Sequence, residues 1–181
     1  MALSVMDVRN SAQADFNIDW AAVQLVQFEH DEKYHREICR LSTQDRLRHM
    51  SLHFAKYAGR LLDDPCEADF RQITVDTMVI AVSCANILNV DLPRKFVPAA
   101  GKPSRSEYTR QLAIAAGKMA AACEKLDHLE DFPFRQTLTA QALGILADSI
   151  ALFHTEGWEP VQEMSERLAK IKAKSIFHGK I

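Results

Sequence analysis

Glycine and proline are scarce in this sequence, with only six of each among 181 residues. Long apolar runs are missing too, because polar residues interrupt the two longest, MVIAVSCANILNV and LGILADSIALF, and both are too short to span a bilayer. The first residues, MALSVMDVRNSAQADF, lack the basic start and continuous apolar core of a signal peptide. We therefore expect a protein that neither crosses a membrane nor binds to one.

Cysteine and net charge are also low. The chain has four cysteines, which are far apart and form no CxxC pair: Cys39, Cys66, Cys84 and Cys123. This spacing favours buried, reduced thiols in a cytoplasmic protein over a disulfide framework. The formal net charge of −2 gives no support for nucleic-acid binding. The sequence also lacks a nucleophile motif, a Walker loop, a dinucleotide fingerprint and zinc-finger spacing.

What the sequence does contain is helical periodicity. Hydrophobic residues make up 48% and recur at helical spacing, whereas no window alternates as a half-buried strand would. Asp19 and Ser42 are suitable N-caps, and Asp64-Pro65 fits an N-cap followed by a proline at the first helical position. We predict an all-α helical bundle of about six helices, at residues 19–41, 42–64, 65–89, 106–129, 133–156 and 159–175.

The tripeptide FRQ occurs twice, at residues 70–72 and 134–136, and similar segments, AGRL and AGKM, precede the two copies. This order predicts a single all-α domain, 1–181, with internal repeats 42–92 and 104–158 joined by a proline-rich linker, 91–105. Each repeat is expected to form a helical hairpin. Two hairpins packed face to face would make a four-helix core, braced by the first and sixth helices. The alternative is two unrelated hairpins of similar composition.

One pair of helices carries a family-like pattern. The first contains Gly59 and Leu61 within RLRHMSLHFAKYAGRLLDD, the second contains Asp76, and ANILNVDL ends the pair. These features resemble the all-α nucleotide pyrophosphohydrolases of the MazG-like group, whose motifs are L-x-x-E-x-G-E-L, E-L-x-D-V and an NxLGIDL-like ending. The resemblance covers about Leu41 to Leu92, and more loosely Arg110 to Trp158.

The chain departs from that group at the carboxylates. The resemblance implies four facing carboxylates that hold Mg²⁺ on a triphosphate. Tyr57 and Arg60 stand where two glutamates are expected, Ile73 replaces a third, and Ala115 and Lys118 occupy the first-motif positions of the second copy. Added positive charge at these positions repels Mg²⁺. The resemblance, with these departures from it, therefore implies a pseudoenzyme that needs no cofactor.

Our leading interpretation is therefore a binding or regulatory module for a nucleotide or another anion. Its expected ligand-binding residues are His53, Lys56, Tyr57 and Arg60 on one helix, with Arg71 at the start of the next. The alternative is a polar rim in which these cations pair with the acidic residues between the two helices.

A second interpretation keeps the enzyme as an active Mg²⁺-dependent pyrophosphohydrolase with a rearranged site. Glu29 and Glu32 form an ExxE pair on one helical face, and together with Asp76 they would supply oxygen ligands for Mg²⁺. The alternative for the two glutamates is a solvated charged face.

Histidines suggest one more site. His49 and His53 are four residues apart, and His30 and His35 lie one helix earlier. These histidines would form either a transition-metal site or no site at all, as ordinary, partly exposed side chains.

Asp148 lies in an apolar segment. It is expected either to be buried and paired or to face a cleft.

A third interpretation of the whole chain is a helical adaptor that binds a protein partner. All three interpretations are compatible with a monomer or a homodimer.

Overall fold

The computed structural model describes residues 17–179, and within this range the chain forms eight helices and no strands, which confirms the all-α prediction. The helices are α1 (Trp20–Tyr34), α2 (Arg36–Cys39), α3 (Thr43–Leu62), α4 (Glu67–Ile87), α5 (Leu92–Lys95), α6 (Arg105–Asp127), α7 (Phe134–Glu156) and α8 (Pro160–Lys174). The six long helices lie in the predicted regions. None of the helices between residues 17 and 179 has the length and hydropathy needed to cross a bilayer.

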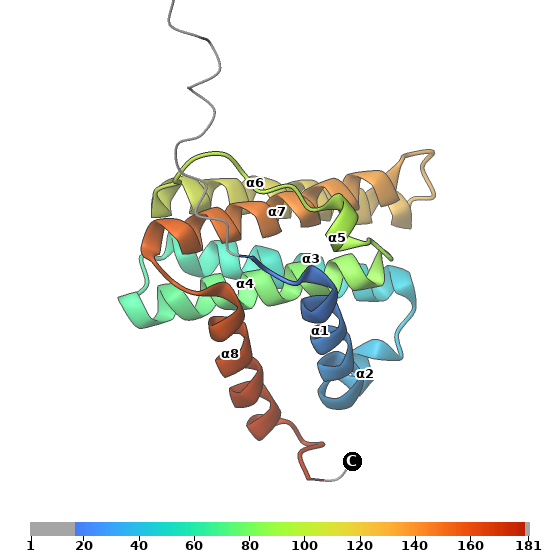
Figure 1. The fold of residues 1–181 in the computed structure, drawn as a ribbon. Coiled ribbons are helices and arrows are strands. Elements are labelled where there is room, and N and C mark those ends of the chain that lie inside the picture. The colour runs from blue at the N-terminus through green and yellow to red at the C-terminus, as the bar shows by residue number, and fades with distance from the viewer. Residues whose placement is uncertain (1–16, 180–181) are drawn as a thin grey trace, which may run out of the picture.

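The four longest helices form two layers (Figure 1). α3 and α4 make one hairpin, α6 and α7 make the other, and α3 packs on α6 while α4 packs on α7. α1 and α8 pack against α4 and project from the α3–α4 layer on the side away from α6 and α7. The expected four-helix core with two bracing helices is therefore present. That the two hairpins are copies of one unit stays a prediction.

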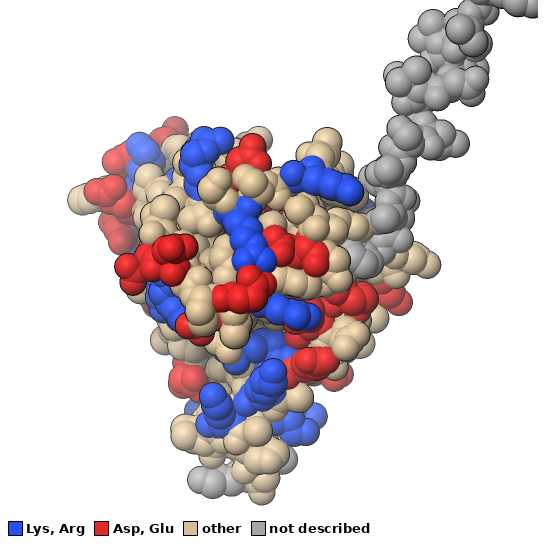
Figure 2. All heavy atoms as spheres, turned by 90° about the vertical axis from the view of Figure 1, so that its left-hand side faces the viewer, with Lys and Arg blue, Asp and Glu red and all other residues tan. Residues whose placement is uncertain are grey.

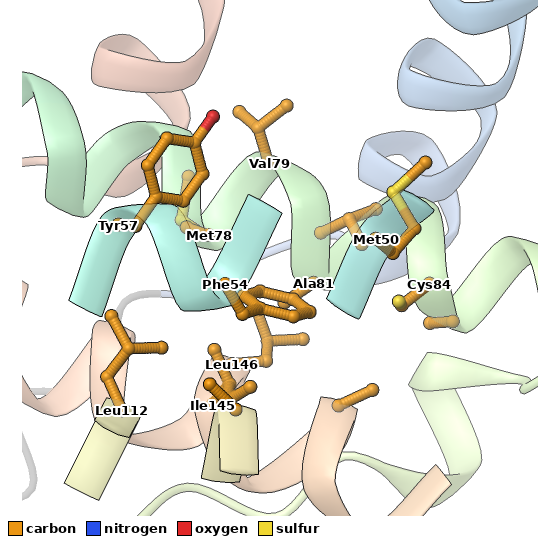
Figure 3. Close-up of a cluster of buried hydrophobic side chains, with 14 of the residues drawn as sticks. Met50, Phe54, Tyr57, Met78, Val79, Ala81, Cys84, Leu112, Ile145 and Leu146 are labelled. Atoms are coloured by element: carbon orange, nitrogen blue, oxygen red, sulfur yellow. The ribbon is translucent and has the colours of Figure 1, made fainter. Parts of the chain in front are cut away.

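The core lies between these layers. Phe54 of α3 is fully buried, and Figure 3 shows its ring beside Leu146 and Ile145 of α7. Tyr57, one helical turn after Phe54, also belongs to this cluster, but its hydroxyl points away from Leu112 and Leu146. Burial of apolar area at about 25 cal/mol per Å² is the main force that holds the two hairpins together.

Helix starts follow the local sequence where a side chain caps the backbone. The Asp19 carboxylate accepts a hydrogen bond from the Ala22 amide at 3.0 Å, and the Ser42 hydroxyl accepts one from the Asp45 amide at 3.1 Å, so both predicted caps are confirmed. α6 begins with a capping box formed by Ser104 and Glu107.

Two predicted boundaries were wrong. α4 does not begin at Pro65: its N-cap is Cys66, and Asp64 takes a left-handed backbone conformation with φ of +48° that makes the turn out of α3. The first helix is not continuous to residue 41, because His35 leaves helical geometry at φ −129° and ψ 40° and separates α1 from α2. Both departures are backbone turns that apolar periodicity does not report.

Charged side chains of both signs are interspersed on the face shown in Figure 2. Some charged side chains form ion pairs between helices. Arg105 at the start of α6 donates hydrogen bonds to Glu67 of α4 at 2.9 Å and to Glu156 of α7 at 2.8 Å. These contacts join three helix ends on the surface of the bundle.

Candidate functional site

A cavity of about 320 Å³ lies between the outer helices and the α3–α4 layer. α1 and α2 line one side, α8 lines the other, and α3 and α4 form the floor. We call this cavity the lateral cleft. Its volume is within the range of small-molecule sites. Its charged and titratable lining residues, among those the structure describes, are His30, Asp31, His35, Cys39, Arg46, His49, His53, Lys56, Tyr57, Arg60, Asp76 and Arg167.

Positive charge exceeds negative charge in the lateral cleft. Among the residues described, four cationic side chains line it, from Arg46, Lys56, Arg60 and Arg167, against two carboxylates. These six side chains alone leave two positive charges uncompensated within the cleft. A half-enclosed site of this kind attracts anions more strongly than the exposed surface does, because water screens its charges less.

Asp76 is the carboxylate on the floor of the lateral cleft, and Arg167 of α8 neutralises it. The guanidinium donates from Nε to Oδ1 at 2.5 Å and from Nη2 to Oδ2 at 2.9 Å. The Asp76 side chain is buried, so this fork-shaped pair is held in a partly desolvated environment. Both carboxylate oxygens are therefore already engaged by a cation.

A chain of polar contacts runs along α3. The Nε2 atoms of His49 and His53 are 3.0 Å apart, and His53 Nδ1 lies 3.2 Å from both the Tyr57 hydroxyl and Lys56 Nζ. Because the ammonium only donates, His53 Nδ1 accepts, and the proton on His53 Nε2 is donated to His49. Burial, with Lys56 as the next cause, lowers the pKa of His53 to about 4, so the His53 imidazole is neutral at pH 7.

On the opposite wall, Asp31 belongs to a buried network. Gln27 donates to Asp31 Oδ1 at 2.9 Å, and the Ser83 hydroxyl of α4 donates to Asp31 Oδ2 at 2.7 Å. Burial raises the pKa of Asp31, while the hydrogen bonds from Ser83 and Gln27 oppose that rise. The two donors hold the carboxylate in one orientation at the edge of the cleft.

His30 and His35 flank this carboxylate. His30 is buried, and its Nε2 lies 3.2 Å from the carbonyl oxygen of Leu168 on α8. Burial is the largest cause that lowers the pKa of His30, so the ring is neutral at pH 7. His35 sits at the break between α1 and α2, with its ring centroid 5.7 Å from that of His30.

Cys39 lies nearby on α2 but is not an activated nucleophile. Burial, followed by the negative charge of Glu32, raises the pKa of its thiol to about 11. The prediction that all four cysteines are buried was wrong, because Cys66 is exposed at the start of α4 and Cys39 is half-buried. All four are free thiols, as expected.

The predicted ligand-binding residues come together in part. His53, Lys56, Tyr57 and Arg60 all line the lateral cleft, because a helical repeat places them along one side of α3. Arg71 does not line it. Its guanidinium pairs with Glu163 of α8 and lies over the ring of Trp158, at the other end of the α4–α8 contact.

The predicted Mg²⁺ ligands are not brought together. Glu29 and Glu32 are exposed on α1 and do not line the lateral cleft, whereas Asp76 lies inside it and is bound to Arg167. α1 turns its Gln27 and His30 side toward α4 and α8, and this orientation leaves the two glutamates in solvent.

Several cleft residues were missed by sequence reasoning. Arg167 is 91 residues from Asp76, so no local pattern links them. Gln27 did carry a signal, because it lies on the buried face of α1 between Val23 and His30, at spacings of four and three. His30 itself was one of the histidines considered for a transition-metal site. Polar residues on a buried helical stripe suggest a buried polar network.

Asp148 is not the fully buried, paired aspartate that was one of its two expected settings. Its side chain is half-buried on α7, it does not line the lateral cleft, and burial raises the pKa of its carboxyl.

Comparisons of the chain with protein-family models, curated proteins and solved structures find no match.

Proposed function

We propose that this protein is a binding module whose lateral cleft holds an anionic small molecule of the nucleotide or phosphate class. The observation that carries the proposal is the excess of cationic over carboxylate side chains in the cleft, with three of the cations on one helix, α3. Phosphate oxygens accept charge-assisted hydrogen bonds from arginine and lysine, and such bonds are about twice as strong as neutral ones.

Two of these cations have no acidic side chain in direct contact, although the Arg46 charge acts on Asp31 and the Asp76 charge acts on Lys56 from further away. Within residues 17–179, neither Arg46 nor Lys56 has a carboxylate oxygen within 4.0 Å, and Arg60 reaches Asp69 only at 4.0 Å. The Nε atom of Arg46 is buried and has no hydrogen-bond partner among the described residues. A buried cationic donor without a partner is costly, and a bound anion would remove that cost.

The resemblance to the MazG-like group is part of this proposal. The fork-shaped contact between Arg167 and Asp76 supports binding without Mg²⁺-dependent hydrolysis, because Asp76 is the one motif carboxylate that this chain retains. Arg60 lies where that group is expected to place a metal ligand, and here it offers a direct contact for a phosphate. We propose the cytoplasm as the location, in keeping with four free thiols.

Isothermal titration calorimetry with inorganic pyrophosphate and nucleoside triphosphates, without divalent cations, tests the proposal. Arg46→Ala and Lys56→Ala should each weaken binding by about tenfold or more, since a hydrogen bond to a charged group contributes about 1.5–3 kcal/mol. Lys118→Ala is the matched control, because Lys118 is an exposed cation on α6 outside the cleft.

Absence of binding by every anion in this set would refute the proposal, as would equal affinity of wild type and Arg46→Ala. Release of pyrophosphate from a nucleoside triphosphate in the presence of Mg²⁺ would instead favour the enzyme interpretation.

A protein-binding adaptor is the second candidate function. The exposed apolar side chains of Leu25, Val26 and Phe28 on α1 favour it. Sedimentation of wild type and Phe28→Glu measures whether this face joins two copies: a homodimer that becomes monomeric in the variant would support it.

A further inference from the structure

The clearest unassigned group of side chains lies where α1 meets α2. His30, Asp31 and His35 each offer one metal-ligating atom, and these three atoms lie within 4.8 Å of one another. We propose that this group, called here the junction triad, binds one divalent transition-metal ion of the Zn²⁺ type. The inference is independent of the anion proposal, because metal binding is measured with the metal alone.

His30 supplies the strongest observation. Its Nε2 faces the carbonyl oxygen of Leu168, which only accepts, so Nε2 carries the proton and Nδ1 carries the lone pair in the neutral ring. His30 is 8% exposed, and its Nδ1 is buried with no hydrogen-bond partner among the described residues. A metal-ligating histidine normally donates its other ring N–H to a carbonyl or carboxylate, as His30 does here.

Asp31 is oriented in the way that metal-ligating carboxylates are. Gln27 and Ser83 donate to its two different oxygens, and Gln27 also donates to the Ser83 hydroxyl at 3.0 Å. Gln27 and Ser83 are both buried, so the support for the carboxylate is rigid. Each oxygen keeps a lone pair for an ion.

His35 completes the junction triad because the helix breaks at this residue. In a continuous helix, residues 30 and 35 would lie on different faces, but the break turns the His35 ring to within 5.7 Å of the His30 ring. Around a tetrahedral ion with bonds of about 2.1 Å, ligand atoms stand about 3.4 Å apart. Binding therefore requires the ligand atoms to move inward, which a residue outside regular helix permits.

The donor set selects the class of metal. Two imidazole nitrogens and one carboxylate oxygen suit Zn²⁺, Co²⁺ and related ions, whereas Mg²⁺ prefers oxygen ligands only. Because all three side chains line the lateral cleft, a fourth coordination position faces the cleft and is open to water or an anion.

The nearby His49 and His53 are a weaker pair for an ion. Their Nε2 atoms already form a hydrogen bond with each other, and Lys56 places a positive charge beside His53. The junction triad includes the Asp31 carboxylate, which attracts a cation, while the charges of Arg46 and Lys172 act on Asp31 and His30 from nearby.

The experiment is a Zn²⁺ titration of the untagged, metal-free protein in competition with a chromogenic chelator, repeated with Co²⁺ and followed by its visible absorption. We expect one ion per chain, no displacement by millimolar Mg²⁺, and affinity lost or weakened by more than about 100-fold in His35→Ala and Asp31→Asn. His128→Gln, at the exposed end of α6, and His53→Gln should bind as wild type does.

Circular dichroism of the metal-free variants checks that each is folded, and His35→Ala is the first choice because His35 is only half-buried. The inference is overturned if the wild type binds neither ion, if folded His35→Ala and Asp31→Asn bind as tightly as wild type, or if binding is lost in His53→Gln instead.

Discussion

Arg167 of α8 donates two hydrogen bonds to the two carboxylate oxygens of Asp76 on α4, at 2.5 and 2.9 Å. The Asp76 side chain is 8% exposed, and the pair closes the floor of the lateral cleft against α8. This ion pair thus joins two helices through residues that are 91 positions apart in the sequence. The same pair removes Asp76 from any role as a metal ligand.

Removal of the Arg167 guanidinium should strongly destabilise the fold. Arg167→Ala leaves the buried Asp76 carboxylate unpaired, and we expect a loss of about 3–5 kcal/mol in the free energy of unfolding measured with urea. Arg71→Ala is the matched control, since Arg71 also pairs α4 with α8 through Glu163 but is exposed, and it should cost about 1 kcal/mol or less. Equal losses in the two variants would contradict this account.

Ser83→Ala should weaken metal binding without removing a ligand. The change deletes the donor to Asp31 Oδ2 and leaves the junction triad intact, so we expect Zn²⁺ affinity to fall by about 10–100-fold. Ser149→Ala removes another fully buried serine hydroxyl, one that contacts Tyr108 on α6, and should leave Zn²⁺ affinity unchanged. Chelator competition measures both. A Ser83→Ala variant with wild-type affinity would show that Asp31 needs no such support.

Stability should fall as the pH is lowered from 7 to 4, and His53 should contribute to this fall. The pKa of His53 is lowered to about 4 by burial, and then by Lys56, His49 and His35, whereas an unfolded histidine titrates near 6.5. Between these values the unfolded chain binds more protons, so the free energy of unfolding rises with pH. Thermal melts of His53→Gln should therefore show a shallower pH dependence than wild type. An identical pH dependence in the two proteins would show that His53 does not contribute to the loss of stability at low pH.

The contribution of the α6 capping box to stability should be measurable on its own. Ser104→Ala removes the hydroxyl that accepts from the Glu107 amide at 3.3 Å, and we expect a loss of about 1 kcal/mol in unfolding free energy. Gln111→Ala, at an exposed position further along the same helix, should change stability by less than about 0.5 kcal/mol. A loss in Gln111→Ala as large as in Ser104→Ala would argue against the cap.

Part of the candidate site could be predicted from the sequence because it lies on one helix. His53, Lys56, Tyr57 and Arg60 share one side of α3, and helical geometry alone brings them together. Arg71, at the start of the next long helix, was predicted to join this group. Its guanidinium instead pairs with Glu163 of α8 and lies over the ring of Trp158, and these contacts hold it outside the cleft.

The sequence by itself determined the number and positions of the long helices, because apolar spacing and N-caps such as Asp19 and Ser42 are local properties. Only the tertiary structure decided which polar groups meet. The pairing of Arg167 with Asp76, the network of Gln27, Ser83 and Asp31, and the turn at His35 depend on how α1 and α8 pack on α4. Local periodicity sets which face of a helix is buried, but the partner of a buried polar group is set by contacts between residues far apart in the chain.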